Sequence, residues 1–279
     1  MPVHDDLGTR MKEFYEQVPK TRLMRRVPVA LRLDGKAFHT FTRGFEKPFD
    51  DILIEAMQRT MQYLCENIQG CVLGYTQSDE ITLILIDYQT LDTDAWFGYE
   101  VQKMDSIAAS MATMAFNKYF NQEVIKFYNQ IWDDIIEDWT GTSEEIEYYN
   151  TLQKAVDKGA LFDCRCWNIP KEEVCNLVYW RQLDASRNSV QMVGQAYFSH
   201  AELQHKSCSN IQDMLMEKYN INWNDFPTHQ KRGSCCIRKP AAAGSEDPKG
   251  RSHWEIDLEI PQFKGEGRKY IEDLIYVGE

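Results

Sequence analysis

Apolar residues recur along the chain with two different periods, and the period predicts the kind of element. Spacings of three and four positions predict helices over residues 5–18, 49–68, 99–120, 123–138, 144–156, 171–184 and 186–199. Short runs rich in β-formers predict strands at residues 27–33, 71–76, 81–86, 161–167 and 233–238. The order strand, helix, strand hairpin, helix, strand is typical of an α+β fold, in which helices pack on one face of an antiparallel sheet.

Two polar segments interrupt this pattern. Thr140 to Ser143 reads as a linker with a helix N-cap between two acidic helices. Residues 241–252, with the sequence AAAGSEDPKGRS, have the composition of a flexible loop. No repeat of fixed period is present, so we expect one compact domain.

Composition is ordinary for a globular protein. The 279 residues are 43% hydrophobic and 27% charged, which is enough apolar material for a sizeable core. The longest apolar runs, such as residues 81–86, are far too short to span a bilayer. The first ten residues, MPVHDDLGTR, do not resemble a signal peptide. We therefore expect a cytoplasmic protein without a membrane partner.

The net charge of −12 argues against nucleic-acid binding, because phosphate contacts need Lys and Arg. The distribution weakens that argument. Basic residues cluster between Lys20 and Lys47 and again between Lys231 and Lys239, whereas acidic residues concentrate between Asp133 and Glu147. Each basic cluster is either a solvated face or a phosphate-binding face, and the sequence leaves both interpretations open.

Two aspartates carry the candidate chemistry. Asp34 ends the first predicted strand and Asp79 lies at the tip of the predicted hairpin. If the strands pair, both carboxylates and the Gly35 carbonyl form a hard oxygen site that suits Mg²⁺. Two ions about 4 Å apart would support phosphoryl or nucleotidyl transfer. Asp-Gly and Ser-Asp-Glu are also common solvated turns, so the spacing alone does not decide. No P-loop motif is present.

Two further basic residues have a candidate role. Lys47 precedes a proline in the segment FEKPFD and is a candidate contact for a triphosphate, although it can equally be an exposed surface lysine. Arg165 lies in a predicted apolar strand and needs a partner. That partner is either a phosphate or the nearby Asp163.

Six motifs in sequence order resemble those of the tRNA(His) guanylyltransferase family. They are LRLDGKAFHTFT at residues 31–42, FEKPFD at 45–50, GYTQSDE at 74–80, the helix with Lys103, Ser106, Ser110, Phe116 and Asn117, FDCR at 162–165, and WRQLD at 180–184. Any one of these motifs is weak, but together they cover most of the chain in the correct order.

This resemblance implies a 3′-to-5′ polymerase with a palm-like, ferredoxin-like β-α-β-β-α-β sheet. Residues 1–160 would form the catalytic core, and 161–279 would complete the sheet and add helices for tRNA binding. Asp34, Gly35 and Asp79 would hold two Mg²⁺ ions, and the substrates would be ATP, GTP or other NTPs. Nucleotide contacts would come from Arg32, Lys36, Ala37, Phe38, His39, Lys47, Ser78 and Glu80, and RNA contacts from Lys103, Arg165, Arg187, Asn188, Lys206, Lys231 and Arg232. A homotetramer is implied as well.

One departure from the family pattern changes the expected reaction. The family carries His-Ile-Asn-Asn shortly after WRQxD, whereas this chain has Ser186, Arg187, Asn188 and Ser189. We therefore expect templated repair of 5′-truncated tRNA rather than addition of G at position −1 of tRNA(His). That G addition, a palm-type nucleotide cyclase and a non-enzymatic RNA-binding module remain as alternatives.

Overall fold

The computed structural model describes residues 6–138, 143–240 and 252–277, without the side chains of residues 133–138. Six strands form one antiparallel sheet with the order β4-β1-β3-β2-β5-β6. The strands are β1 Val29–Gly35, β2 Cys71–Gln77, β3 Glu80–Leu85, β4 Phe162–Asn168, β5 Ser234–Lys239 and β6 His253–Asp257. β4 and β6 are therefore the two edges.

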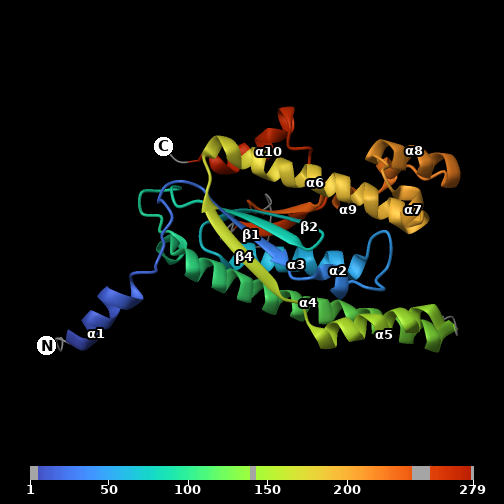
Figure 1. Ribbon diagram of the computed structural model, residues 1–279, viewed down its shortest axis with the longest axis horizontal. Coiled ribbons are helices and arrows are strands. Elements are labelled where there is room, and N and C mark those ends of the chain that lie inside the picture. The colour runs from blue at the N-terminus through green and yellow to red at the C-terminus, as the bar shows by residue number, and fades with distance from the viewer. Residues whose placement is uncertain (1–5, 139–142, 241–251, 278–279) are drawn as a thin grey trace.

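Helices cover both faces of this sheet (Figure 1). α3 (Asp51–Asn67) and α4 (Val101–Asp138) cover one face, with α5 (Ser143–Lys158) packed on α4, whereas α6 (Lys171–Tyr197) and α10 (Lys269–Ile275) cover the other. The shorter helices are α1 Asp6–Met11, η1 Lys12–Glu16, α2 Phe38–Phe41, η2 Trp96–Tyr99, α7 His200–Leu203, α8 Cys208–Tyr219, η3 Trp223–Asp225, α9 Thr228–Arg232 and η4 Gly265–Arg268. No helix in the described ranges is long and apolar enough to cross a membrane.

The fold class expected from the sequence is confirmed, because β1-α3-β2-β3-α4-β4 follows the β-α-β-β-α-β order. Both crossover helices lie on one face, as expected, but α6 and α10 add a layer on the other face that the pattern did not predict. The helices expected at 99–120 and 123–138 are one helix, α4, and those expected at 171–184 and 186–199 are one helix, α6. Neither junction contains the Gly or Pro that would break a helix. Residues 140–142 and 241–251 lie outside the described residues.

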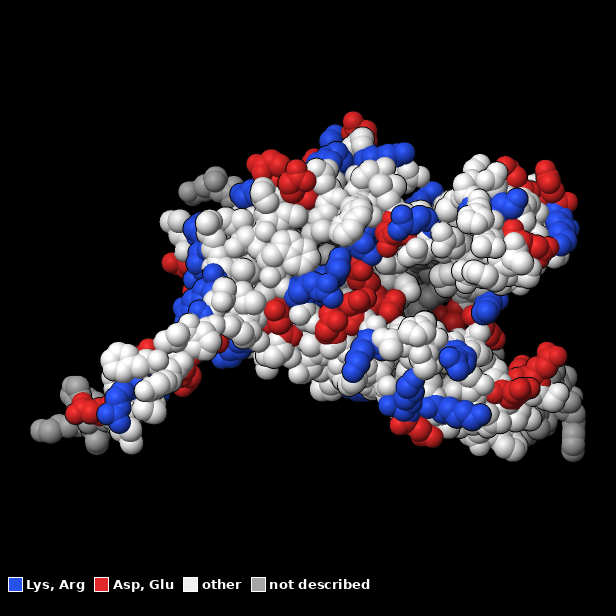
Figure 2. Space-filling view, in the orientation of Figure 1, with Lys and Arg blue, Asp and Glu red and all other residues white. Residues whose placement is uncertain are grey.

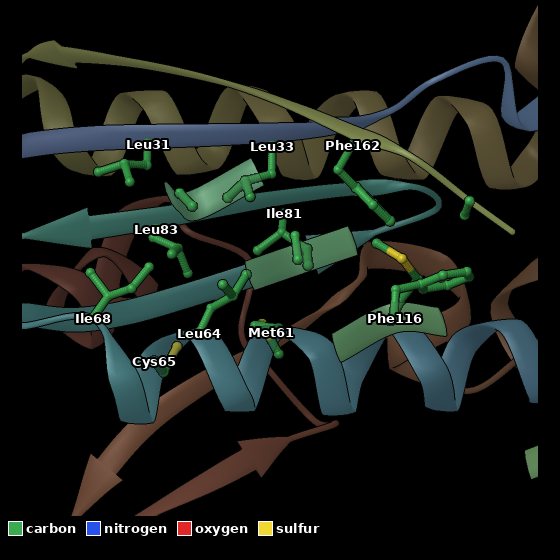
Figure 3. Packing of buried hydrophobic residues seen from close by; sticks show 14 of the residues in the cluster. Leu31, Leu33, Met61, Leu64, Cys65, Ile68, Ile81, Leu83, Phe116 and Phe162 are labelled. Carbon is green, nitrogen blue, oxygen red and sulfur yellow. The ribbon is translucent and has the colours of Figure 1, made fainter. Parts of the chain in front are cut away.

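Alternation along β1 and β3 determines which side chains reach the functional face. Leu31, Leu33, Ile81 and Leu83 point toward α3 and pack there with Met61 and Leu64 (Figure 3). Each fully buried side chain of this size contributes about 1.5–3 kcal/mol, so the register of the two strands is strongly fixed. The alternate residues of the same strands therefore project from the opposite face, toward α6.

Candidate functional site

A row of acidic residues crosses the α6 side of the sheet where β1 ends. Asp34 in β1 lies directly opposite Glu80 in β3 and Asp163 in β4. The backbone N–H of Gly35 donates to the carbonyl oxygen of Asp79 at 3.0 Å, which ties the end of β1 to the tip of the β2–β3 hairpin. Figure 2, which views the sheet from its β4 edge, shows acidic side chains gathered in the middle of the molecule, with basic side chains directly beside them. The fold thus brings Asp34 and Asp79 to neighbouring positions, as the sequence predicted.

Asp79 lies in an environment that disfavours its own charge. Burial raises the pKa of its carboxyl group above the ordinary value, and the negative charge of Asp34 raises it further, although Ser78 Oγ donates a hydrogen bond to Asp79 Oδ1 at 3.0 Å. Within the described residues, no Lys, Arg or His forms an ion pair within 4.0 Å of either aspartate. Two adjacent carboxylates without a basic partner are the arrangement that a bound cation would stabilise.

The two neighbouring carboxylates already have partners. Both carboxylate oxygens of Glu80 accept hydrogen bonds from Arg181, at 2.6 and 2.8 Å. Asp163 pairs with Arg165 at 3.1 Å, one of the two partners that the sequence left open for that arginine. No cluster of three or more His, Cys, Asp or Glu side chains able to hold a metal occurs in the described part of the chain. Two carboxylates and the Gly35 carbonyl still suit Mg²⁺, which takes its remaining ligands from water and phosphate.

A cleft of about 520 Å³ opens at Asp79, and Gly35, the residue after Asp34, lines it too. Seven residues that the sequence assigned to metal or nucleotide binding line this cleft: Gly35, Ala37, Phe38, His39, Lys47, Ser78 and Asp79. Met192 and Gln195 of α6 form part of the wall, so the cleft lies between α2 and the end of α6, where Figure 2 shows a hollow. Its size suits a small organic ligand, and Lys47 supplies a positive charge to its lining.

Three residues of the expected nucleotide set, Arg32, Lys36 and Glu80, do not line this cleft. Glu80 is fully engaged by Arg181. Lys36 lines a separate cavity of about 460 Å³ on the other side of its loop, together with Lys158. Arg32 projects from the sheet face beside Asp34, and its buried Nε has no hydrogen-bond partner in the described residues. Arg32 therefore retains a free donor near the aspartates, although it does not line the cleft.

The loop that carries Lys47 is fastened by the N-cap of α3. Asp50 accepts hydrogen bonds from the backbone N–H groups of Leu53 (2.9 Å) and Glu46 (3.1 Å) and from the hydroxyl of Tyr148 in α5 (2.5 Å). Burial raises the pKa of Asp50 despite these three donors. Asp50 and Glu46 also line the cleft, and the sequence pattern did not identify either as a site residue.

The residues expected to contact RNA lie on different elements. Arg187 and Asn188 lie on α6, where both contact Asp184, and Lys206 is exposed between α7 and α8. Arg232 is the last residue of α9, and its backbone carbonyl accepts a hydrogen bond from the hydroxyl of Tyr75. Lys103 lies at the start of α4, at the far end of the sheet from Asp79, with its ammonium over the ring of Phe97. The expected RNA contacts thus come from several elements, namely α4, β4, α6, α9 and the segment between α7 and α8.

Lys231, which the sequence assigned to RNA binding, is buried in the structure. Only 8% of this residue is exposed, and its ammonium donates to the backbone carbonyl of Asn224. Burial lowers its pKa. A buried, hydrogen-bonded lysine is not available to a phosphate of bound RNA, so its role is to hold α9 against η3. The sequence could not show this, because the surrounding segment has no helical or strand period.

Arg181 is a further residue of this region that the sequence pattern did not identify as part of the site. It belongs to the WRQLD motif and lies in the buried stripe of α6 with Val174, Val178 and Ala185. A charged residue in the middle of an apolar stripe is the signal that could have identified it, because a buried arginine requires a partner.

Comparisons with known proteins agree with this architecture. The family model described as tRNA(His) guanylyltransferase matches residues 8–170. An uncharacterised protein of Acanthamoeba polyphaga mimivirus is 30% identical over 246 residues, covering 83% of this chain and 76% of its own. The tRNA(His) guanylyltransferase of Saccharomyces cerevisiae is 23% identical over 225 residues, covering 76% and 82%.

Solved structures show the same relation. A bacterial tRNA(His) guanylyltransferase-like protein in complex with ATP is 38% identical, with a TM-score of 0.76, and covers 98% of this chain and 100% of its own. A bacterial protein of the same description in complex with GTP is 36% identical, with a TM-score of 0.74 and the same coverage. The crystal structure of the Saccharomyces cerevisiae enzyme, at 20% identity and a TM-score of 0.57, covers 80% of this chain and 91% of its own and supports the fold alone.

Proposed function

The chain belongs to the tRNA(His) guanylyltransferase family, and on that premise we propose that it adds nucleotides to the 5′ end of tRNA in the 3′-to-5′ direction. The observation that carries the proposal is Asp79 in the wall of a cleft that also contains Lys47, with the carboxylate of Asp34 close to it at the end of β1. The related bacterial proteins in complex with ATP and with GTP support a nucleoside triphosphate as the occupant of this cleft.

Each part of the cleft has a role in this proposal. Asp34, Asp79 and the Gly35 carbonyl would hold two Mg²⁺ ions, which when bound lower the pKa of the attacking hydroxyl and offset charge on the leaving group. Lys47 and His39 contact the triphosphate, and Ser78 lies beside Asp79 to donate a hydrogen bond. The phosphate contact expected of Arg32 would require its guanidinium to turn from the sheet face toward the cleft, because its Nε is buried and the residue does not line the cleft.

The reaction has two stages for an RNA with a 5′ monophosphate. The 5′ phosphate first attacks the α-phosphate of ATP, and pyrophosphate leaves. The 3′ hydroxyl of the incoming NTP then loses its proton and attacks the activated 5′ phosphate, and AMP leaves. An RNA with a 5′ triphosphate needs only the second stage, with pyrophosphate as the leaving group. The protein's contribution is to position these groups and to stabilise their charge.

Templated repair is the version of this reaction that the chain favours. At the position of the family's last asparagine in the His-Ile-Asn-Asn motif, Ser189 accepts a hydrogen bond from the Trp223 indole and donates to the carbonyls of Ser186 and Lys231. Ser189 is thus committed to packing α6 against η3 and α9. A template strand supplies the sequence information itself, so the enzyme needs only shape and phosphate contacts.

Those contacts would come from the basic residues Arg165, Arg187, Lys206, Arg232 and Lys103 and from the amide of Asn188. In a homotetramer, a basic residue far from its own cleft, such as Lys103, could contact RNA bound at the cleft of another subunit. Basic residues of several subunits would then contact one tRNA, although each chain has a net charge of −12. The N-terminal helices α1 and η1 contain no buried residue and project from the body, so they are available for subunit contacts (Figure 1). We place the enzyme in the cytoplasm, where tRNA is processed.

Incubation with tRNA that lacks its first 5′ nucleotide tests the proposal. With Mg²⁺, we expect incorporation of the one NTP that pairs with the opposite base, and changing that base to its complement should change the preferred NTP. A chelator should abolish the reaction. Addition of G regardless of the opposite base would favour the −1 addition instead, and turnover of NTP without RNA would favour a cyclase.

A further inference from the structure

Arg181 forms a buried, bidentate ion pair with Glu80, the residue that follows Asp79. Only 7% of Arg181 and 8% of Glu80 are exposed. The guanidinium donates from Nε and Nη2 to the two oxygens of Glu80, at 2.6 and 2.8 Å, and Nη2 also donates to Asp184 at 3.0 Å. Burying two charges costs desolvation energy that only good geometry offsets, so a bidentate pair here defines one orientation of Glu80.

The position of Glu80 makes this ion pair relevant to the cation site. Glu80 follows Asp79 directly and lies opposite Asp34 across the β1–β3 ladder, on the same face of the sheet. Two more carboxylates lie beside the two aspartates, and each has an arginine partner: Asp163 pairs with Arg165, and Glu80 pairs with Arg181 in the buried part of the row. With Arg181 present, both oxygens of Glu80 are occupied, and no group of three metal-ligating side chains is available in the described residues.

We propose that Arg181 is a positioning residue that withholds Glu80 from the divalent-cation site and so limits the protein's carboxylate ligands to Asp34 and Asp79. The inference rests on the proposed function, because it concerns the same cation site. A site with two carboxylates leaves coordination positions for the triphosphate and the RNA 5′ phosphate, whereas a third carboxylate would occupy one of them and bind the cation more tightly. With that third carboxylate bound to the cation, we expect turnover to be slower.

A purely structural role is the competing explanation, in which Arg181 only holds α6 on the sheet. The chain offers a matched control for that role. Arg268 forms an ion pair with Glu272 at 2.8 Å and donates to Asn176 of α6 at 2.8 Å, so it also connects an element to α6, but it does not contact the hairpin. Both arginines therefore contribute to packing around α6, and only Arg181 contacts Glu80.

The test measures Mn²⁺ binding by electron paramagnetic resonance, without RNA or nucleotide, in the wild type and four variants. Arg181→Met should bind Mn²⁺ roughly threefold or more tightly than the wild type, because Glu80 becomes a ligand. Its turnover with Mg²⁺ should fall by about 10–100-fold. The double variant Glu80→Gln/Arg181→Met should return Mn²⁺ affinity to within about twofold of the wild type and recover part of the turnover. Arg268→Met should leave Mn²⁺ affinity unchanged.

Arg181→Lys covers the case in which the methionine variant does not fold. A lysine keeps the charge but replaces the bidentate fork by a single ammonium, so its Mn²⁺ affinity should lie between those of the wild type and Arg181→Met. Unchanged or weaker Mn²⁺ binding in the Arg181 variants would overturn the inference, as would a double variant that behaves like Arg181→Met. Because this titration contains no RNA, it separates the inference from the proposed function, which fails only if the wild type does not extend tRNA.

Discussion

The hydrogen bond between Tyr148 and Asp50 gives a sharp test of how the cleft is held together. Tyr148→Phe removes one hydroxyl and leaves the ring in its edge-to-face contact with Phe127. The lost bond, at 2.5 Å, is donated to a carboxylate that is only 5% exposed. Hydrogen bonds to charged groups contribute about 1.5–3 kcal/mol.

Two features of the site place the expected effect in that range. Asp50 keeps its backbone bonds to Leu53 and Glu46, so the carboxylate is not left without donors, and we expect a loss of about 1.5–2 kcal/mol in the free energy of unfolding. The loop carrying Lys47 loses one of its fastenings, so KM for the NTP should rise severalfold while kcat changes little.

The pH dependence of this loss is also defined. The hydroxyl stabilises the ionised form of Asp50, whose pKa is raised by burial and would rise further without Tyr148. A raised carboxyl pKa means that the folded state binds the proton more tightly than the unfolded state, so protonation of Asp50 favours folding. The destabilisation by Tyr148→Phe should therefore be largest at neutral pH and shrink as the pH falls through the pKa of Asp50.

Tyr149→Phe is the matched control. Tyr149 is the next residue of α5, is also partly buried, and donates to the neutral amide of Gln153 at 3.2 Å within the same helix. Its loss should cost less than about 1 kcal/mol, with no pH dependence. Urea unfolding monitored by circular dichroism measures both variants. Equal losses of stability in the two, or a loss in Tyr148→Phe that is constant with pH, would refute this account of Asp50.

Three further substitutions test other parts of the site. Asp79→Asn should abolish nucleotide addition yet raise the unfolding free energy in chelator by about 0.5–1 kcal/mol, because the ionised carboxyl is disfavoured there; a lower stability measured by urea unfolding would contradict this. Lys231→Met should cost about 1–2 kcal/mol through the bond to Asn224 but leave tRNA affinity in filter binding within twofold, and a selective loss of affinity would restore its RNA role. Gly35→Ala should lower thermal stability by about 1–3 kcal/mol, because its Cβ would lie 2.3 Å from the Phe38 ring, and an unchanged melting temperature would refute that clash.

Local patterns in the sequence determined the sheet core and the two aspartates. β1 and β3 alternate strictly between core and functional face, so Asp34 and the hairpin tip could be placed without coordinates. The interruptions assumed within α4 and α6 were wrong because hydrophobic residues shift around each long helix as it passes from one neighbour to the next, which looks like a break in the period.

Contacts between distant segments account for what the sequence could not predict. The cleft wall combines the 35–50 region with Met192 and Gln195, about 150 residues later, and the pairing of Glu80 with Arg181 spans 101 residues. Nothing in the local pattern distinguishes Lys231, which is buried, from the neighbouring Arg232. The type of reaction was predicted from motifs in the correct order along the chain. Only the structure shows which carboxylates of the site have an arginine partner and which do not.

The direction of chain growth is the central claim, and the fate of the γ-phosphate of the incoming nucleotide tests it most directly. In 3′-to-5′ addition the 3′ hydroxyl of the NTP forms the new bond, so the NTP keeps its triphosphate and becomes the new 5′ end. A 5′-truncated tRNA that carries a 5′ triphosphate, incubated with γ-labelled NTP and Mg²⁺, should therefore become labelled, and Asp34→Asn should prevent this. Incorporation of an α-label together with release of the γ-label from the NTP as pyrophosphate would show growth at the 3′ end and would contradict the account.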